Sequence, residues 1–569
     1  MVSAFFRSLS VPSTTPSRRS FVAFSVLAGV GLPVLAGCDL PGASKAKDSA
    51  SANGSASAKG KAKAGSTDWQ KLDAHIMGHN VTVEVSPVIR KNDTTSIMAL
   101  ELTRAKDDAS IDRVKTDSSD TEDNKLNISS YLGTPSIYRP GTGASLVKLL
   151  DLGSGRVWSA TDGSGADDGF LEITPGEKTT SYLSFGKVDT DTVTVMVPMA
   201  GFTTVSVLEA DAAKNASIDL DAASSNLDQF PDAATELAKP ATIERYTRAL
   251  DDSTSTHTGD KDVTVTLASD VTFASDSADL TPAADTQLQT VADQLDQYPD
   301  GGTLTIVGHT DDVQDDAYNQ TLSEKRANAV KTKLQQLTDL DKWNPTTTGK
   351  GESEPRVKDT TDEARAANRR VEITLTPTGG TTPKDSNTSA TPSNGSDSGK
   401  LPDPQGPVAK GSKGVTLTSK DTNTSGEVTI TLDHLTRTGG YLLGTVTCTV
   451  KDGSTGAPLH PLLEDPQTLL ANQRDEDGSA LPTFNASDGL TLIASGERIF
   501  SADYLDADAE HHLPLTELNI SDHLKTGTTT ICTIWPDPGG DTITLDHPDG
   551  KYSPKGTAYR LTDIPIKNS

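Results

Sequence analysis

The 569-residue chain is poor in aromatic residues, which make up 4% of it, and contains only three cysteines. Its 51 lysines and arginines are outnumbered by 79 aspartates and glutamates, which gives a formal net charge of -28 at pH 7. Nucleic acids and anionic lipid surfaces attract basic proteins, so we expect no nucleic acid partner and no broad membrane contact. The chain is too long for a single hydrophobic core, and its Ser-, Thr-, Asp- and Gly-rich composition favours an exported, multidomain surface protein.

The short motifs by which many enzymes are recognised are also missing. The sequence has no G-x-S-x-G elbow, no H-E-x-x-H motif and no phosphate-binding glycine loop. His75 and His79 lie four residues apart without a third ligand in sight, and the acidic stretch 503–512 lacks the glycine turn of a calcium loop. We therefore predict that the protein is not an enzyme and holds neither a metal nor another cofactor.

The only long apolar run lies near the N-terminus. It follows Arg18 and Arg19, extends from Phe21 to Leu35, and is too short for a comfortable membrane span. It ends in Leu35-Ala36-Gly37-Cys38, which resembles a bacterial lipobox. Residues 1–38 are thus predicted to be a lipoprotein signal peptide, exported by the general or the twin-arginine route, with Cys38 the site of lipidation, by palmitate among other acyl chains. Residues 39–67 are a Ser-, Ala-, Gly- and Lys-rich flexible tether.

Two regions of alternating apolar and polar residues predict β-structure. Residues 68–210 and 413–569 both contain runs of this period separated by Gly, Asp, Asn and Pro, and we expect each to be a predominantly β, sandwich-like domain. Residues 211–260 are a polar connecting segment. Residues 378–412, which consist of Gly, Thr, Pro, Ser and Asn with few apolar residues, are predicted to be a disordered linker.

The most informative pattern lies between these regions, in residues 261–377. Gly308-His309-Thr310-Asp311 follows an alternating strand, and three further blocks come after it in order. They are Tyr318-Asn319-Gln320-Thr321-Leu322-Ser323-Glu324-Lys325-Arg326-Ala327-Asn328-Ala329-Val330, Gly349-Lys350-Gly351-Glu352-Ser353-Glu354-Pro355 and Asn368-Arg369-Arg370-Val371-Glu372. Together the four blocks resemble the signature of the OmpA-like peptidoglycan-binding domain. Strands at 263–267, 304–307 and 371–375, with helices between them, predict an α+β domain of order β-α-β-α-β.

The resemblance implies a site for the stem peptide of peptidoglycan, at meso-diaminopimelate. The free end of that residue carries an ammonium and a carboxylate, for which Asp311 and Arg326 supply complementary charges. A lysine-type stem lacks the carboxylate, so Arg326 would lose its partner. His309 is assigned to shaping the loop. The resemblance places these residues at the site: Asp311, Arg326, Thr310, Asn319, Leu322, Arg369, Phe273 and Ala274.

The two remaining cysteines, Cys448 and Cys532, each lie in a strand-like run of the last region. In an exported protein such a pair predicts a disulfide bond. A redox pair is disfavoured because the close C-x-x-C spacing is missing.

The sequence thus predicts a cell-envelope lipoprotein that binds peptidoglycan without a covalent bond and links membrane to wall. It would be anchored by its N-terminal lipid to the outer face of the cytoplasmic membrane, or to an outer membrane if one exists. The alternative is an adhesin or ligand-binding surface lipoprotein whose β-domains carry the specific function, through envelope proteins or other partners.

Overall fold

The computed structural model describes residues 63–109, 124–133, 143–160, 171–223, 237, 239–381, 401–420, 425–451, 456–464, 486–506, 512–520, 523–549 and 556–569. The predicted signal peptide, Cys38 and most of the tether lie outside these residues. Within them, no helix combines the length and the apolar character that a bilayer crossing requires.

The described chain is mostly β, and one sheet dominates its N-terminal region. Its strands follow the order β1-β2-β4-β3-β11-β10-β6-β7-β12, and β9 pairs with β4. These strands are β1 (Gln70–Ile76), β2 (His79–Val85), β3 (Val88–Arg90), β4 (Thr95–Arg104), β6 (Lys148–Asp151), β7 (Arg156–Ser159), β9 (Lys178–Gly186), β10 (Thr192–Val197), β11 (Gly201–Glu209) and β12 (Ala241–Thr242). The predicted β character of 68–210 is confirmed, while the sandwich arrangement stays a prediction.

A second sheet contains the strands of the OmpA-like region and of the C-terminal region. Its order is β17-β16-β18-β15-β14-β13-β26-β25-β31-β32-β22-β23-β21-β20, with β19 on β32 and β30 on β23. These are β13 (Arg245–Ala249), β14 (Thr254–Thr258), β15 (Val263–Ala268), β16 (Gly302–His309), β17 (Trp343–Gly351), β18 (Arg370–Pro377), β19 (Val408–Lys410), β20 (Val415–Lys420), β21 (Ser425–Thr431), β22 (Leu435–Thr438), β23 (Tyr441–Val450), β25 (Thr491–Ala494), β26 (Glu497–Ile499), β30 (Gly527–Pro536), β31 (Thr542–His547) and β32 (Tyr559–Asn568).

Short elements complete the described chain. They are the strand pairs β5 (Leu126–Asn127) with β8 (Glu172–Ile173), β24 (Ala457–Pro458) with β29 (His523–Leu524) and β27 (Asp503–Leu505) with β28 (His512–Pro514), the short helix α1 (Ser129–Leu132), and the 3-10 turns η1 (Ala210–Ala212) and η2 (His460–Leu462).

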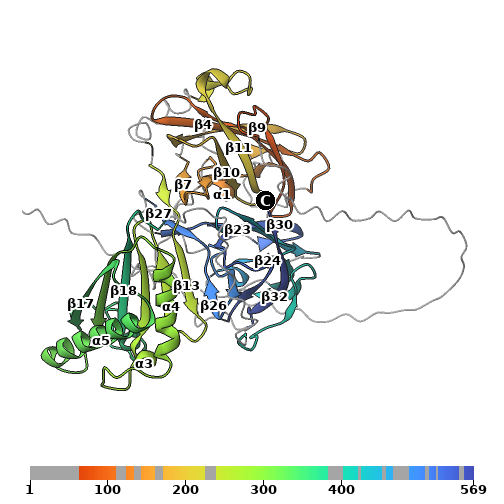
Figure 1. The fold of residues 1–569 in the computed structure, drawn as a ribbon. Helices are drawn as coiled ribbons and strands as arrows, with labels where there is room; N and C mark the ends of the chain where they lie inside the picture. Colours follow the sequence, from red (N-terminus) through yellow and green to blue (C-terminus); the bar gives the residue numbers. More distant parts are fainter. Residues whose placement is uncertain are drawn as a thin grey trace, which may run out of the picture. The chain divides into compact units, whose positions relative to one another are not determined.

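The OmpA-like region places two helices on one face of four strands (Figure 1). After β15 come α3 (Ser269–Thr272) and α4 (Ala284–Asp296), and α5 (Asp316–Leu337) lies between β16 and β17. Asp315 caps α5 by accepting a hydrogen bond from the Tyr318 amide at 2.9 Å. Ala327, Val330 and Leu334 form the buried stripe of α5 and join the core of this region.

The predicted order β-α-β-α-β is incomplete, because a fourth strand is present. β17 runs parallel to β16 at the edge of the sheet, and α6 (Asp362–Asn368) follows it before β18. Its sequence, WNPTTTGKG, carries Pro345 and has no alternating apolar residues. An edge strand tolerates both, since one side of it needs no hydrogen-bond partner in the sheet.

Two segments predicted to be irregular also contain strands. The connecting segment 211–260 contains the β13–β14 hairpin, in which β14 pairs with β15 and β13 pairs with β26. Within the predicted linker 378–412, Val408–Lys410 forms β19 in parallel with β32, so the linker prediction is wrong for these residues. None of these three strands has a strong apolar alternation. β13 and β14 pair with each other, while β26 and β32, which are distant in the sequence, supply further hydrogen bonds to β13 and β19.

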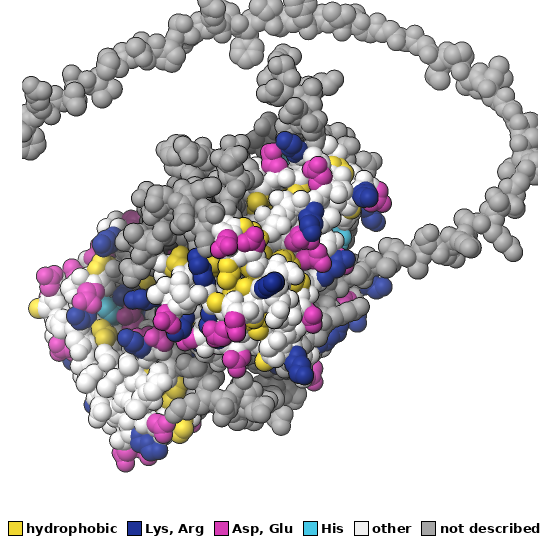
Figure 2. Space-filling model, turned by 90° about the horizontal axis from the view of Figure 1, so that it is seen from above, with side chains coloured by type: hydrophobic (Ala, Val, Ile, Leu, Met, Phe, Trp, Pro, Cys, Tyr) yellow, Lys and Arg dark blue, Asp and Glu magenta, His cyan; other side chains and the backbone are white. Residues whose placement is uncertain are grey.

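Charged side chains on the described surface are intermixed by sign. On the face seen in Figure 2, Lys and Arg lie among Asp and Glu, and no broad region of a single sign covers it. Such a surface gives little long-range attraction for a polyanion or a polycation.

The predicted disulfide is not formed, because Cys448 and Cys532 are both free and buried. They lie on the neighbouring antiparallel strands β23 and β30, where Cys532 pairs with Thr445, three positions before Cys448. Side chains alternate between the two faces of a sheet, so the two thiols project from opposite faces. They belong to different hydrophobic clusters, and no change of rotamer brings the sulfurs into bonding distance.

We expect both thiols to be inert in the folded protein. Burial raises the pKa of Cys448 to about 12 and that of Cys532 well above its usual value, so neither forms the reactive thiolate near neutral pH. In a Cys38→Ser variant, a thiol reagent should label neither cysteine before unfolding and both after unfolding, without reductant. Labelling of neither cysteine in the unfolded chain would show that a disulfide exists.

Candidate functional site

The candidate site forms where β16 ends and the chain turns toward α5. Gly308 and Gly349, on β16 and β17, lie so close to Ser323 of α5 that a Cβ at either position would collide with it. Glycine at both positions lets the helix approach the sheet. The close approach holds the first turns of α5 against the strand ends, and the loop 310–315 is confined between them.

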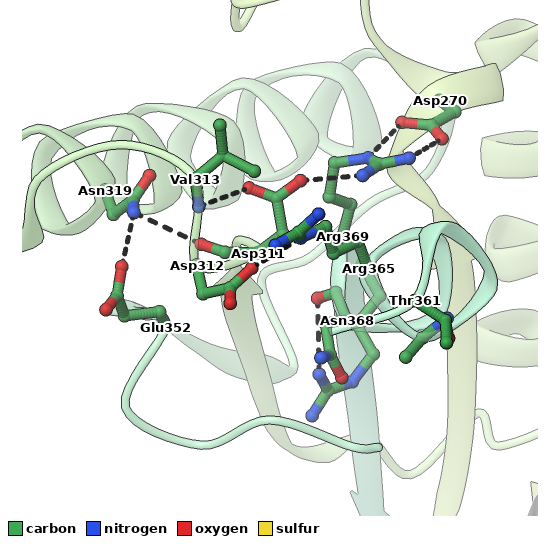
Figure 3. Close-up of polar contacts among 12 residues, drawn as sticks. Asp270, Asp311, Asp312, Val313, Asn319, Glu352, Thr361, Arg365, Asn368 and Arg369 are labelled. Atoms are coloured by element: carbon green, nitrogen blue, oxygen red, sulfur yellow. Dashed lines mark hydrogen bonds and ion pairs between the residues drawn. The ribbon is translucent and has the colours of Figure 1, made fainter. Parts of the chain in front are cut away.

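Asp311 is the acidic centre of this loop, and Arg369 binds it directly. The Asp311 Oδ2 atom accepts a hydrogen bond from Arg369 Nη1 at 2.6 Å, and its Oδ1 accepts one from the Val313 amide at 3.3 Å (Figure 3). Its side chain is 14% exposed. The Asp311 carboxylate is thus held in place while part of it still meets solvent.

Arg369 is clamped by a second carboxylate, that of Asp270. The Arg369 Nε and Nη2 atoms donate to the two oxygens of Asp270 at 2.7 and 2.6 Å, the planar two-bond pairing that arginine favours with a carboxylate (Figure 3). The hydrogen bonds to Asp270, and then those to Asp311, raise the pKa of Arg369. The carboxylates of Asp270 and Asp311 share the single guanidinium of Arg369, so these three side chains together carry one net negative charge.

Among the residues that the structure describes, Arg326 forms no ion pair with an acidic side chain. Its residue is 5% exposed, its Nε donates to the Ser277 carbonyl at 3.0 Å, and its guanidinium carbon lies 5.1 Å from the centre of the Phe273 ring. Burial lowers the pKa of Arg326, although the nearby carboxylates of Asp270 and Asp276 oppose that effect. Among the described residues, its two terminal nitrogens have no hydrogen-bond partner, so they can receive an anion.

The structure does not pair Asp311 with Arg326 directly. Arg369 bonds to Asp311 and also lies near enough to Arg326 to help lower its pKa. Asp311 and Arg326 thus belong to one cluster, in which Arg369 contacts Asp311. The predicted convergence of both charges on one ligand stays a prediction.

The other predicted site residues have differing surroundings. Asn319 is 1% exposed, and its amide nitrogen donates to the Asp311 carbonyl at 3.1 Å and to Glu352 Oε2 at 2.6 Å, so it shapes the loop. Thr310 is buried, and its hydroxyl has no partner among the described residues. Phe273 is buried beneath Arg326. Ala274 is exposed and Leu322 is half-buried.

His309 lies behind the loop and stays neutral. It is 2% exposed, and its Nε2 is 3.8 Å from Glu372 Oε2, while Arg370 holds that carboxylate at 2.6 Å. Burial, helped by the positive charge of Arg370, lowers the pKa of His309 to about 4. An uncharged, enclosed ring agrees with the loop-shaping role predicted for it.

Asp270 is the residue that sequence reasoning missed. It lies just after β15, in a single helical turn. A lone acidic residue in such a place predicts only a turn. Its partner Arg369 lies 99 positions later, so no local pattern links the two. Of the available signals, only its position three residues before Phe273, which was itself a predicted site residue, pointed to it.

We expect Asp270 to act on ligand binding through Arg369. Asp270→Asn replaces a charged acceptor and should weaken binding of the peptidoglycan ligand that the resemblance implies about threefold to tenfold, because Arg369 would no longer be fixed against Asp311. In an Arg369→Ala background the same change should have no further effect, as a double-mutant cycle would show. Asp285→Asn, which breaks an exposed pair with Lys333 at 2.7 Å, is the matched control and should leave binding unchanged. Additive losses in the cycle would contradict the positioning role.

The comparisons with known proteins agree on this region. The model of the OmpA family matches residues 272–369. Over 103 residues the chain is 43% identical to outer membrane porin F of Pseudomonas aeruginosa. The aligned stretch covers 18% of this chain and 29% of the porin. Over 111 residues it is 36% identical to the lipoprotein YfiB of Escherichia coli. This aligned stretch covers 19% of this chain and 68% of YfiB. The chain therefore spans less than a third of the porin but about two thirds of YfiB.

Among solved structures, the peptidoglycan-associated lipoprotein of Burkholderia pseudomallei is 29% identical, and the match covers 18% of this chain and 86% of that one, with a TM-score of 0.17. The matched residues of the family model include Phe273, Asp311, Arg326 and Arg369, which the structure brings into one cluster. With the extent of the likeness to YfiB, this identifies the chain as a member of the OmpA family.

Proposed function

We propose that this protein binds peptidoglycan without a covalent bond through its OmpA-like domain, residues 261–377, and links the wall to a membrane. The observation that carries the proposal is the buried guanidinium of Arg326, which forms no ion pair with an acidic side chain among the described residues, in the same cluster as the partly exposed carboxylate of Asp311. Leaving such a cation without an anion costs free energy, and a bound carboxylate would recover it. Membership of the OmpA family supports the same function.

The ligand that suits this pair is the free end of meso-diaminopimelate in an uncrosslinked stem peptide. Its carboxylate accepts from the two free nitrogens of Arg326, and its ammonium donates to Asp311. Each charge-assisted hydrogen bond contributes about 1.5–3 kcal/mol before desolvation is subtracted. Cross-linking converts the ammonium into an amide and removes the charge that Asp311 recognises, so uncrosslinked stems are preferred.

The placement in the cell follows from the N-terminal sequence. Cys38 is the proposed site of the lipid, which anchors the chain in the outer face of the cytoplasmic membrane, or in an outer membrane if the host has one. A flexible tether, as predicted for residues 39–67, would have a root-mean-square reach of roughly 30 Å and would separate the folded part from the lipid headgroups. The lipid and the wall site would then hold the two layers together.

The test compares two kinds of stem peptide. The full chain should bind diaminopimelate-type stems at least about tenfold more tightly than lysine-type stems in a calorimetric titration, because only the former offers a carboxylate to Arg326. Asp311→Ala should weaken binding to the diaminopimelate type by at least about tenfold, while Asp312→Ala, which removes an exposed partner of Arg365, should not. Equal affinity for both stem types would refute diaminopimelate as the ligand, and absence of binding to either would refute the function.

A further inference from the structure

A polar cavity of about 230 Å³ is formed without any of the wall-site residues. It is lined by the turn of the β13–β14 hairpin, by β26, β31 and β32, and by the segment 402–405. Its charged residues are Arg248, Arg498, Arg560, Asp546, Asp252 and Asp403. Three guanidinium groups around one cavity are unusual in a chain with a net charge of -28.

Two of these arginines oppose each other across a pair of strands. Arg248 of β13 is the direct register partner of Arg498 of β26. Side chains in such positions lie close together, and like charges directly opposite each other are destabilising. The arrangement needs negative charge between or beside the two guanidinium groups.

The carboxylates of the cavity supply only part of that charge. Asp546, 8% exposed, is shared by Arg498 Nη2 at 2.8 Å and Arg560 Nε at 2.7 Å. Asp252 binds Arg248 Nε at 2.8 Å but is 70% exposed, and Asp403 is exposed, so water screens both. The inner wall therefore holds three cations against one buried anion. His547 adds no charge, because burial lowers its pKa to about 4.

Several N–H groups of the three arginines are not used by the protein. Beyond the bonds to aspartates, Arg498 Nη1 donates to Thr491 Oγ1 at 2.5 Å and Arg560 Nη1 donates to the Pro402 carbonyl at 2.7 Å. Both terminal nitrogens of Arg248, the Nε of Arg498 and the Nη2 of Arg560 have no partner within the described part of the chain. These donors come from three different strands around one space.

We propose that this cavity is a binding site for a phosphoryl group, as the free ion or as a phosphate ester. A tetrahedral oxyanion can accept hydrogen bonds from three directions at once, whereas a carboxylate offers its two oxygens in a single plane. It would neutralise the opposed pair Arg248 and Arg498. Occupancy would also join the β13–β14 hairpin to β26 and β32, and so couple ligand binding to the pairing of these strands.

The experiment is a binding titration of the full chain with inorganic phosphate and, separately, with glycerol 3-phosphate, at constant ionic strength. We expect saturable binding, and Arg248→Gln should raise the Kd at least about tenfold. Arg248 suits the test because its one protein partner is exposed, so its loss leaves the fold intact. Tight binding of glycerol 3-phosphate would identify an ester as the ligand, and binding of inorganic phosphate alone would identify the free ion.

The matched control is Lys410→Gln, which removes one positive charge from an exposed pair with Asp563, outside the cavity. It should leave the Kd unchanged. The proposal would be overturned by an absence of saturable binding, by equal losses in Arg248→Gln and Lys410→Gln, or by acetate competing as well as phosphate does. A second check is thermal unfolding without phosphate, in which Arg248→Gln should be at least as stable as the parent because the like-charge pair is gone.

Discussion

Replacing Arg326 with alanine is expected to weaken binding of the full chain to diaminopimelate-type stem peptides by at least about tenfold. The side chain would contribute two charge-assisted hydrogen bonds to the ligand carboxylate, and a loss of about 1.5–3 kcal/mol corresponds to a factor of about ten to a hundred in Kd. Arg326→Lys should lose most of the affinity as well, because lysine keeps the charge but has no planar fork. Calorimetric titration with a soluble stem peptide measures both effects.

The control for this experiment is Arg365→Ala. Arg365 lies on α6 in the same domain, and its Nε binds Asp312 at 2.7 Å in a pair whose side chains are 29% and 44% exposed. Its removal should change the Kd by less than about twofold. Because Arg326 packs on Phe273, circular dichroism and thermal unfolding must show that the alanine variant is folded. Unchanged affinity in a folded Arg326→Ala variant would dismiss the site.

The second large effect concerns stability and arises from Glu517, far from the wall site. Its carboxylate is 1% exposed, and its Oε1 accepts hydrogen bonds from the Met199 amide at 2.8 Å and the Cys532 amide at 2.9 Å. Met199 lies in the turn between β10 and β11 with a φ of 56°. Glu517 therefore ties a turn of the N-terminal sheet to β30. Burial outweighs these hydrogen bonds and raises the pKa of Glu517 to about 7.

A raised carboxylate pKa makes the folded protein less stable as the pH rises. The folded chain binds the proton of Glu517 more tightly than the unfolded chain, whose value lies near 4.5. The stabilisation is complete below about pH 4.5 and is lost as the pH rises through about 7. The difference between the two pKa values corresponds to about 3 kcal/mol. Glu517→Gln should therefore match the parent near pH 4.5 and exceed its stability by up to about 3 kcal/mol near pH 8.

Urea unfolding of the parent and of Glu517→Gln at several pH values provides the measurement. The variant must be compared with the parent because His309 and His547 change the pH dependence of stability in the opposite direction to Glu517. Burial lowers the pKa of each to about 4, so the stability that they contribute above pH 6.5 is lost as the pH falls toward 4. Subtracting the two curves removes the histidine contributions. A difference between the variants that does not change with pH would refute the assignment to Glu517.

The OmpA-like domain could be predicted because its signals are local. Each of the four motif blocks is a short run that contains a charged residue at fixed spacing, and the structure gives a reason for the glycines of two of them in the contact of Gly308 and Gly349 with α5. The buried stripe of α5 follows the helical period. β17 escaped prediction because an edge strand next to solvent requires no apolar alternation, so the sequence carried no signal for it.

The disulfide prediction failed for a reason that composition cannot reveal. Two cysteines in an exported chain favour a bond, but the bond depends on which face of the sheet each side chain occupies. The register of β23 and β30 decides that, and a shift by one residue would reverse it. The same dependence on distant partners explains why Asp270, whose importance comes from Arg369, was overlooked.

By itself, the sequence determined the family, since its motif blocks are made of residues close together in the chain. The bounds of the wall-binding region and the charges that serve it stay predictions. Only the tertiary structure decided which charges meet: it placed Arg369 on Asp311, left Arg326 without an ion pair among the described residues, and set Arg248 opposite Arg498. Electrostatic interaction depends on distance in space and on burial, and neither is set by separation along the chain.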